Sequence, residues 1–216
     1  QKDTIIDLVA KGYARKLSSF IGANYGAFHN PNIKDREYSI ETAKKLLAEA
    51  GYTDDNPLEF ELLTYAPNKE YVDIATVIKA QLAEADVTVN INRAERGVFV
   101  DGLINRTYQA NLGQWTADFD DPADIGAFAT IYEDSFSWNS GWNNKEAADT
   151  FRRTETAFDR DERISIFYEL QEIMFHHSVV NPLYTKDVLY GFSDKIEGLR
   201  VNSNDRILTQ NLRKRN

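Results

Sequence analysis

Hydrophobic positions recur along the chain with two different periods, and their alternation predicts a layered α/β domain. Around residue 60 apolar and acidic residues alternate in Leu58-Glu-Phe-Glu-Leu, the pattern of a strand that is covered on one face. Segments with helical spacing and further apolar runs follow. The expected elements are a strand over 58–65, a helix over 69–85, a strand over 87–91, a helix over 97–105 and a strand over 109–114. This order is typical of strands joined by helical crossovers.

The residues before this unit predict two helices separated by a long connection. The first begins at once and ends at Gly12, and a chain that opens inside a helix is expected to be a piece of a longer protein. Residues 13–38 contain several Gly and Asn without a clear period, which predicts a long surface connection. Ser39 is suited to cap a second helix over 40–50.

The pattern changes after Pro122, where helices dominate. Two apolar runs near the C-terminus indicate short strands, and the last six residues are polar and indicate a frayed end. The expected elements are a short helix over 123–132, a loop over 133–143, helices over 145–158 and 160–177, strands over 179–184 and 188–192, and a frayed end over 211–216.

Composition and charge limit the possible functions. The chain has 216 residues, of which 42% are hydrophobic and 27% charged, as in an ordinary globular domain. Its net charge of -9 argues against nucleic acid and anionic membranes as partners, because both require a basic surface. The absence of cysteine excludes disulfides and thiolate metal sites.

The turn after the strand over 109–114 combines an aromatic ring with a carboxylate. It reads Trp115-Thr-Ala-Asp118 and continues with Phe119. Open α/β sheets place ligand-binding groups at strand ends of this kind. A protonated amine can pair with the acid and lie against the ring. The turn therefore indicates binding rather than catalysis.

Several more acids follow Asp118, and we interpret two of them as structural. Asp121 suits the N-cap of the helix that follows, with Pro122 at its first position and Asp124 near the positive end of its dipole. Asp118 has no such explanation. Two other interpretations stay open: a calcium loop, although the Gly and Glu of an EF-hand are missing, and a carboxylate pair for glycoside hydrolysis, which requires facing carboxyls roughly 5 to 9 Å apart.

The remaining candidates are two tryptophans and two histidines. Trp138 and Trp142 stand in a loop rich in Ser, Asn and Gly, where a ring is hard to bury, so both are candidates to line a cleft. His176 and His177 are adjacent and point to different faces of a helix, so we interpret them as helix-end residues rather than metal ligands. No nucleophile elbow, phosphate loop or His-Glu-x-x-His motif is present.

Four segments form a series whose order and spacing are informative. They are residues 3–14, which end in a Gly turn, Thr42-Ala-Lys-Lys-Leu-Leu-Ala-Glu-Ala-Gly51-Tyr52, the Trp115–Asp118 turn with Pro122, and the stretches 161–171 and 182–184. Together they cover nearly the whole chain. In this order they resemble the C-terminal part of the family 5 extracellular solute-binding proteins, the peptide-binding receptors of ABC importers.

The resemblance implies the fold and its division. The fold class would be α/β: one lobe, a mixed sheet flanked by helices, of a two-lobed periplasmic-binding-protein-like fold of type II. Residues 1–38 would form a helix and a long connection near the inter-lobe region. Residues 39–192 would form the ligand-binding lobe, and 193–216 would lead back toward the other lobe.

The resemblance also assigns roles within the site. It implies that Asp118 pairs with the N-terminal ammonium of a peptide and that Trp115 forms a wall of the pocket. Two positions depart from the oligopeptide receptors, which tend to carry an aromatic residue where this chain has Arg96 and an Arg where it has Leu112. Arg96 is therefore a candidate partner for a ligand carboxylate. With Phe119 and Trp142, these residues complete the predicted site.

The function implied is capture of a peptide and its delivery to an ABC permease of the inner membrane, a transient partner. The protein would be a monomer without enzymatic activity, cofactor or metal, either periplasmic or a cell-surface lipoprotein. Three alternatives stay open: the ligand-sensing domain of a transcriptional regulator, a receptor for another solute such as a metal chelate or a sugar, and a hydrolase that uses the acidic loop.

Overall fold

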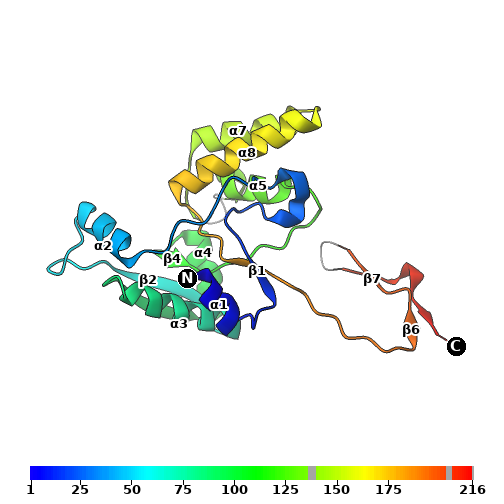
Figure 1. The fold of residues 1–216 in the computed structure, drawn as a ribbon, viewed down its shortest axis with the longest axis horizontal. Coiled ribbons are helices and arrows are strands. Elements are labelled where there is room, and N and C mark those ends of the chain that lie inside the picture. Colours follow the sequence, from blue (N-terminus) through cyan, green and yellow to red (C-terminus); the bar gives the residue numbers. More distant parts are fainter. Residues whose placement is uncertain (136–139, 203–205, 216) are drawn as a thin grey trace.

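The computed structural model describes residues 1–135, 140–202 and 206–215, so Trp138 lies outside the described residues. These residues form a layer built on a small sheet, a layer of helices above it, and a C-terminal arm that extends away from both (Figure 1). Within the described part of the chain, no helix is long and apolar enough to cross a membrane. The division expected at residues 38 and 192 stays a prediction.

The sheet is parallel and has the strand order β3-β2-β4. Its central strand, β2 (Glu59–Tyr65), pairs along its whole length with β3 (Thr88–Ala94). β4 (Ala110–Asn111) pairs only with the middle of β2 and is shorter than the strand predicted over 109–114, because the chain turns away after the Leu112 N–H bonds to the Leu63 carbonyl at 3.1 Å. Antiparallel pairing occurs, among the described residues, in separate two-stranded ladders.

The two crossover helices cover opposite faces of the sheet. Leu62 and Leu63 are neighbours in β2 and therefore point to opposite sides. Leu62 packs in one cluster with Ile74 of α3 (Lys69–Ala83). Leu63 lies against Gly102 of α4 (Arg96–Asn105), where an added Cβ would stand 3.0 Å from its Cδ2. The chain thus crosses β2 between β3 and β4, and the crossover changes face.

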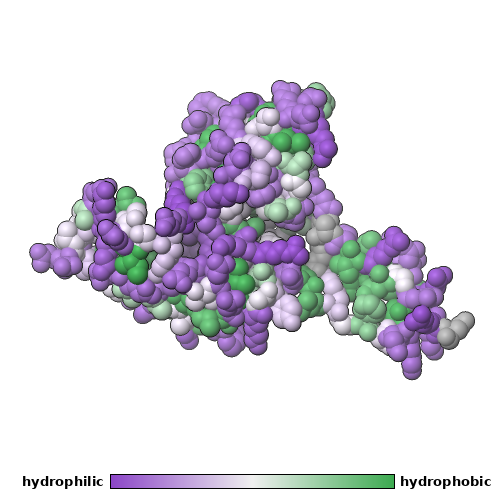
Figure 2. Space-filling view, in the orientation of Figure 1, coloured by the Kyte–Doolittle hydropathy of each residue, from purple (hydrophilic) through white to green (hydrophobic). Residues whose placement is uncertain are grey.

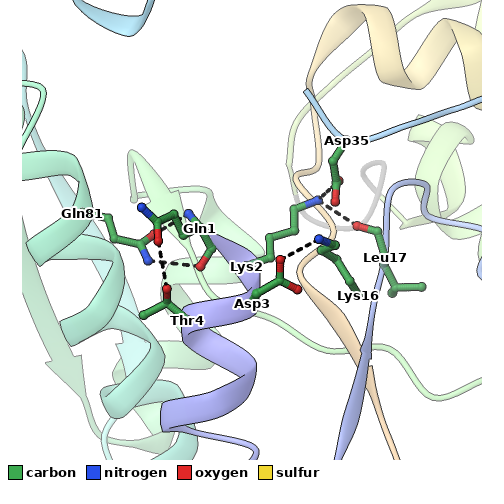
Figure 3. Close-up of polar contacts among 8 residues, drawn as sticks. All are labelled: Gln1, Lys2, Asp3, Thr4, Lys16, Leu17, Asp35 and Gln81. Carbon is green, nitrogen blue, oxygen red and sulfur yellow. Dashed lines mark hydrogen bonds and ion pairs between the residues drawn. The ribbon is translucent and has the colours of Figure 1, made fainter. Parts of the chain in front are cut away.

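Two N-terminal helices complete this layer. α1 (Lys2–Leu8) adds Ile5 to the cluster on the α3 face. It ends at Leu8, before the predicted Gly12, and Lys11 and Gly12 both have positive φ. Lys2 of α1 pairs with Asp35 and donates to the Leu17 carbonyl, which ties the helix to the connection that follows (Figure 3). α2 (Ile40–Glu49) is capped by the Ser39 hydroxyl, which accepts from the Thr42 N–H at 3.0 Å, as predicted.

The connection over 13–38 is not a surface loop, and that prediction was wrong. It contains β1 (Ala14–Lys16) and the 3-10 helix η1 (Ala23–Phe28), and Ile21 and Asn30 within it are fully buried. The reason is a side chain far along the sequence. The Gln171 amide accepts from the Ser19 hydroxyl and the Asn30 N–H and donates to the Phe28 carbonyl, which satisfies the polar groups that burial would otherwise leave without partners.

The upper layer consists of helices. They are α5 (Ala123–Thr130), α6 (Tyr132–Ser135), α7 (Lys145–Thr156) and α8 (Arg160–His177). Asn144 and Asp159 cap α7 and α8. Phe151 and Phe167 are buried at the centre of this layer, together with Ile21 from the connection.

The chain leaves the helices through β5 (Tyr184–Lys186), which pairs antiparallel with β1. Of the strand predicted over 179–184 only its last residue pairs, and the strand predicted over 188–192 is wrong: that segment is extended but has no strand partner. Its apolar side chains have no second strand to pack against. Val188, Leu189 and Phe192 are instead 52, 68 and 60% exposed.

The arm contains two short ladders and apolar surface. β6 (Ile196–Glu197) pairs with β9 (Arg213–Lys214), and β7 (Arg200–Val201) pairs with β8 (Ile207–Leu208), followed by the 3-10 turn η2 (Thr209–Asn211). The frayed end predicted over 211–216 was therefore wrong in part, because an ion pair from Arg213 to Glu197 at 2.7 Å supports the β6–β9 ladder. Hydrophobic atoms gather on the part of the arm nearest the body (Figure 2).

Candidate functional site

The carboxyl edge of the sheet is the natural place for a ligand. β2, β3 and β4 are parallel, so the segments that follow Tyr65, Ala94 and Asn111 all leave from this edge. The crossover changes face between β2 and β4, and in open α/β sheets ligands are expected to bind beside such a position. The Trp115–Asp118 turn follows β4 and therefore starts at this point, as the sequence predicts.

Trp115 joins the sheet to the helical layer. Its ring is half-buried against the helical core, with its centroid 4.0 Å from that of Phe128 in α5 and a tilt of 43°. Leu112, three residues earlier, is buried in the core of the sheet layer. The segment between them passes from one core to the other. Both ends of this short segment are thus packed, which holds the start of the turn in place.

Asp118 presents its carboxylate to solvent while its backbone is held. The side chain is 73% exposed, and its Oδ1 lies 4.0 Å from a guanidinium nitrogen of Arg206 on the arm. The backbone N–H donates to Oδ2 of the buried Asp124 at 2.8 Å. A carboxylate with this exposure and a fixed backbone can accept hydrogen bonds from a cation that arrives from solution.

Asp121 and Asp124 have internal partners, as their structural interpretation requires. The helix begins at Ala123 as predicted, but Pro122 rather than Asp121 occupies the N-cap position. Asp121 still serves the helix start, since its Oδ1 accepts from the Ala123 N–H at 2.8 Å. It also accepts two hydrogen bonds from Arg163, which hold the pKa of the Asp121 carboxyl below its ordinary value.

Of the other predicted site residues, one belongs to this turn and two lie on other elements. Phe119 follows Asp118 directly and is 52% exposed. Arg96 is exposed at the start of α4, after β3, so β2 stands between its strand and that of the turn. Trp142 is half-buried against the helical core, with its ring centroid 5.5 Å from that of His177. The structure joins Trp115, Asp118 and Phe119 in one turn. That any of the five predicted site residues contacts a ligand stays a prediction.

Sequence reasoning missed two residues that contact the acids of this turn. Arg163 lies 42 positions from Asp121 along the chain, and its place in a segment that resembles the family was the only signal. Arg206 lies between short strands of the arm and had no signal in the sequence. Both are cations whose role depends on a partner that is distant in sequence, which periodicity does not reveal.

Two hollows lie elsewhere on the surface of the described residues. One shallow hollow lies over α5 and α7 and is lined by Phe151 and Arg152, and another lies beside α2 and is lined by Lys44 and Tyr52; neither includes the turn. Across 1–135, 140–202 and 206–215, no group of three or more His, Cys, Asp or Glu is placed to hold a metal ion. The acids around Asp118 therefore do not form such a group.

Comparison with known sequences places the chain in a family. The model of "Bacterial extracellular solute-binding proteins, family 5 Middle" matches residues 1–132. Di/tripeptide-binding protein 2 of Pseudomonas aeruginosa is 29% identical over 157 residues, which are 70% of this chain and 29% of the relative. The nickel-binding protein NikA of Staphylococcus aureus is 23% identical over 199 residues, which are 91% of this chain and 40% of the relative. The chain thus spans well under half the length of these relatives.

Solved structures with the same fold support the expected fold class. DppA of Helicobacter pylori, in complex with the peptide STSA, superposes with a TM-score of 0.82 at 21% identity, covering 100% of this chain and 42% of that one. A dipeptide-binding protein from Pseudoalteromonas, in complex with Met-Leu, gives 0.82 at 20% identity, covering 100% and 43%. The α/β lobe predicted from the sequence is confirmed as a fold of this kind.

Proposed function

The chain belongs to the bacterial extracellular solute-binding proteins of family 5, and on this premise we propose that it is the ligand-binding lobe of a peptide receptor of an ABC importer. The observation that carries the proposal is the turn after β4, where the exposed Asp118 carboxylate stands next to the packed Trp115. Binding rather than turnover is the activity of the family. The peptide-binding relatives support the choice of ligand.

The proposed anchor is an ion pair between Asp118 and the N-terminal ammonium of a peptide. An ammonium donates up to three hydrogen bonds, and a carboxylate accepts them strongly because both groups are charged. The aromatic face of Trp115 or Phe119 adds an attraction for the same cation. An N-terminal amine is present in every unmodified peptide, so this anchor is independent of peptide sequence.

The exposure of Asp118 implies that a second surface must cover the ligand. An ion pair in contact with water contributes only about 0 to 1 kcal/mol, because solvent screens it. The same pair becomes stronger when water is excluded, since the effective dielectric constant falls. We therefore expect the rest of the protein to close over Asp118 when peptide binds, which shifts a population from open to closed molecules.

Delivery follows from closure. The closed, loaded form docks transiently on a permease of the inner membrane, and the receptor itself acts as a monomer in the periplasm or as a lipoprotein on the cell surface. Arg96, at the start of α4, follows β3 at the same edge of the sheet and is proposed to meet the ligand carboxylate.

The test compares free and blocked peptides by calorimetry on the full-length protein. We expect a pool of dipeptides and tripeptides to bind, and N-acetylation to weaken binding by at least about tenfold, which corresponds to about 1.4 kcal/mol. Asp118→Asn should cause a similar loss for free peptides only. Asp120→Asn, an exposed acid two residues away, is the matched control and should bind as the wild type does. Equal binding of free and acetylated peptides would remove the amine anchor.

Arg96 is tested at the other end of the peptide. We expect Arg96→Glu to weaken binding of peptides with a free carboxylate more than binding of C-terminally amidated ones. Arg93→Glu places the same charge change on an exposed residue of β3 and serves as control. Peptide affinity that is intact in Arg96→Glu would exclude this role.

A second candidate ligand is a metal chelate, because relatives named as nickel-binding proteins match most of the chain. Nickel(II) with histidine is the probe for this candidate. Binding of that probe without binding of either peptide pool would favour a chelate receptor and exclude the peptide receptor.

A further inference from the structure

Arg163 is the most fully engaged cation near the proposed site. It lies in the first turn of α8, and its Nη1 and Nη2 donate to the two carboxylate oxygens of Asp121 at 2.8 and 2.7 Å. Two parallel bonds of this kind fix the direction of both groups as well as their distance. The pair therefore joins α8 to the turn that precedes α5 in one defined orientation.

The guanidinium is itself held by two other elements, α7 and η1, and by a ring of its own helix. Its Nε donates to the Thr154 carbonyl near the end of α7 at 3.0 Å. Its carbon lies 5.4 Å from the ring centroid of Phe28 and 5.2 Å from that of Phe167. The side chain is 20% exposed, so solvent screens this pair less than it does a fully exposed one. A lysine would keep the charge but lose the planar fork and the stacking.

The contacts continue from Asp121 to Asp118. Asp121 Oδ1 also accepts from the Ala123 N–H, and the Asp121 carbonyl accepts from the Asp124 N–H at 3.2 Å. The Asp124 carboxylate then accepts from the Asp118 N–H. The carboxylates of Asp121 and Asp124 thus hydrogen-bond within the segment from Asp118 to Asp124, and Arg163 joins this segment to α7 and α8.

We infer that Arg163 is a positioning residue for Asp118 and acts through Asp121. The inference rests on the proposed binding role of Asp118. It differs from a purely structural role, in which Arg163 would only brace α8 against the turn. A brace contributes to stability alone, whereas a positioning residue also sets how well the site distinguishes a free ammonium from a blocked one.

The chain offers a matched control for this distinction. Arg153 of α7 donates to both carboxylate oxygens of Glu169 in α8, each at 2.9 Å, so it too joins two elements of the helical layer. The described contacts of Arg153 do not include the turn. The variants are Arg163→Met, Arg163→Lys, Asp121→Asn, the double variant Arg163→Met with Asp121→Asn, and Arg153→Met as control.

Three quantities are measured on the full-length protein: the ratio of affinities for free and N-acetylated dipeptides, the melting temperature, and amide hydrogen exchange over residues 113–124. We expect the ratio to fall about tenfold in Arg163→Met and Asp121→Asn, and no further in the double variant, because both act through one contact. Arg163→Lys should recover the ratio only in part. Arg153→Met should lower the melting temperature without changing the ratio.

The inference would be overturned if folded Arg163→Met and Asp121→Asn had a lower melting temperature but an unchanged ratio of affinities for free and acetylated dipeptides. Arg163 would then have a structural role only. Asp121→Asn and Arg163→Lys keep the test valid if Arg163→Met fails to fold. If the wild type does not distinguish free from acetylated peptides, the proposed function fails. Hydrogen exchange alone then tests whether Arg163 positions the turn. Faster exchange confined to 113–124 in Arg163→Met would support positioning of the turn, and unchanged exchange there would overturn it.

Discussion

The backbone N–H of Asp118 bonds to the side chain of Asp124 at 2.8 Å, so the exposed acid of the turn is held by a buried one. The two acids belong to one run of similar residues, yet they have opposite surroundings. Asp124 has 6% of its surface exposed and accepts from the backbone, whereas Asp118 directs its carboxylate to solvent. Their different environments, rather than their shared charge, decide their roles.

Replacement of Asp124 by alanine should weaken binding at Asp118. The variant leaves the Asp118 N–H without its acceptor, and the loss of one such hydrogen bond costs about 1 kcal/mol of unfolding free energy. Asp124→Asn keeps an oxygen that can accept, so its effect should be smaller. Urea unfolding and calorimetry with a free dipeptide measure the two effects. Equal affinity in Asp124→Ala and the wild type would show that this contact does not hold the turn.

Gln171→Met should destabilise the whole lobe. The substitution keeps the volume of the side chain but removes the acceptor of the buried Ser19 hydroxyl and the buried Asn30 N–H. Two buried donors without partners correspond to a loss of roughly 2 to 4 kcal/mol. The midpoint of urea unfolding measures it, with the exposed Gln210→Met as control. A shift no larger than in the control would mean that the connection over 13–38 is held by packing alone.

Gly126→Ala should disturb the packing of α5 on α7. An added Cβ would stand 2.9 Å from Phe151 Cε2 in the helical core, so the Phe151 ring or one of the two helices must shift. Overpacking of this kind costs about 1 to 3 kcal/mol. Gly97→Ala in α4 has open space around the new Cβ and is expected to change stability by less than about 1 kcal/mol, in the stabilising direction. Thermal unfolding of both variants compares them, and equal melting temperatures would contradict the close packing of α5 on α7.

Lowering the pH should reduce the unfolding free energy of the protein, in part through protonation of Asp121. Its pKa is lowered in the folded state, chiefly by the hydrogen bonds from Arg163, from an ordinary value of about 3.9. The unfolded chain therefore takes up this proton first as the pH falls, so the stabilisation is present above about pH 4 and is lost as the pH falls through the folded pKa. Urea unfolding between about pH 5 and 2 should show a shallower decline for Asp121→Asn than for the wild type. Parallel curves for the two proteins would contradict this coupling.

The parts of the fold that were predicted correctly depend on neighbours in sequence. The Ser39 cap, the alternation in β2 and the turn at Trp115 are each determined within a few residues. The errors have a common physical cause. Segment 13–38 resembles a surface loop in composition, yet Ile21 is buried in it because Gln171, from a helix some 140 residues later, supplies the partners of the surrounding backbone.

In the candidate site, too, the sequence predicted contacts between neighbours but not contacts between residues distant in sequence. Trp115, Asp118 and Phe119 lie within five residues of one another, so the sequence alone predicted that they share one turn. A strand end brings the residues that follow it to the edge of the sheet. Arg163 and Arg206 approach the same turn from α8 and from the arm, and their contacts arise only when these elements pack. The β-branched and aromatic residues of 188–192 misled the prediction for the opposite reason, since a strand needs a partner and none lies beside that segment in the described residues.

The pairing of β1 with β5 has a consequence for how such a lobe can be inherited. Lys16 stands opposite Tyr184, so the two ends of the intervening 17–183 segment lie side by side and run in opposite directions. A segment with adjacent ends can be exchanged between proteins without stretching the host chain. Recombination at these two strands would transfer the parallel sheet, helices α2 to α8 and the Asp118 turn together. A receptor could in this way acquire a new ligand preference in a single genetic event while the remainder of its chain stays the same.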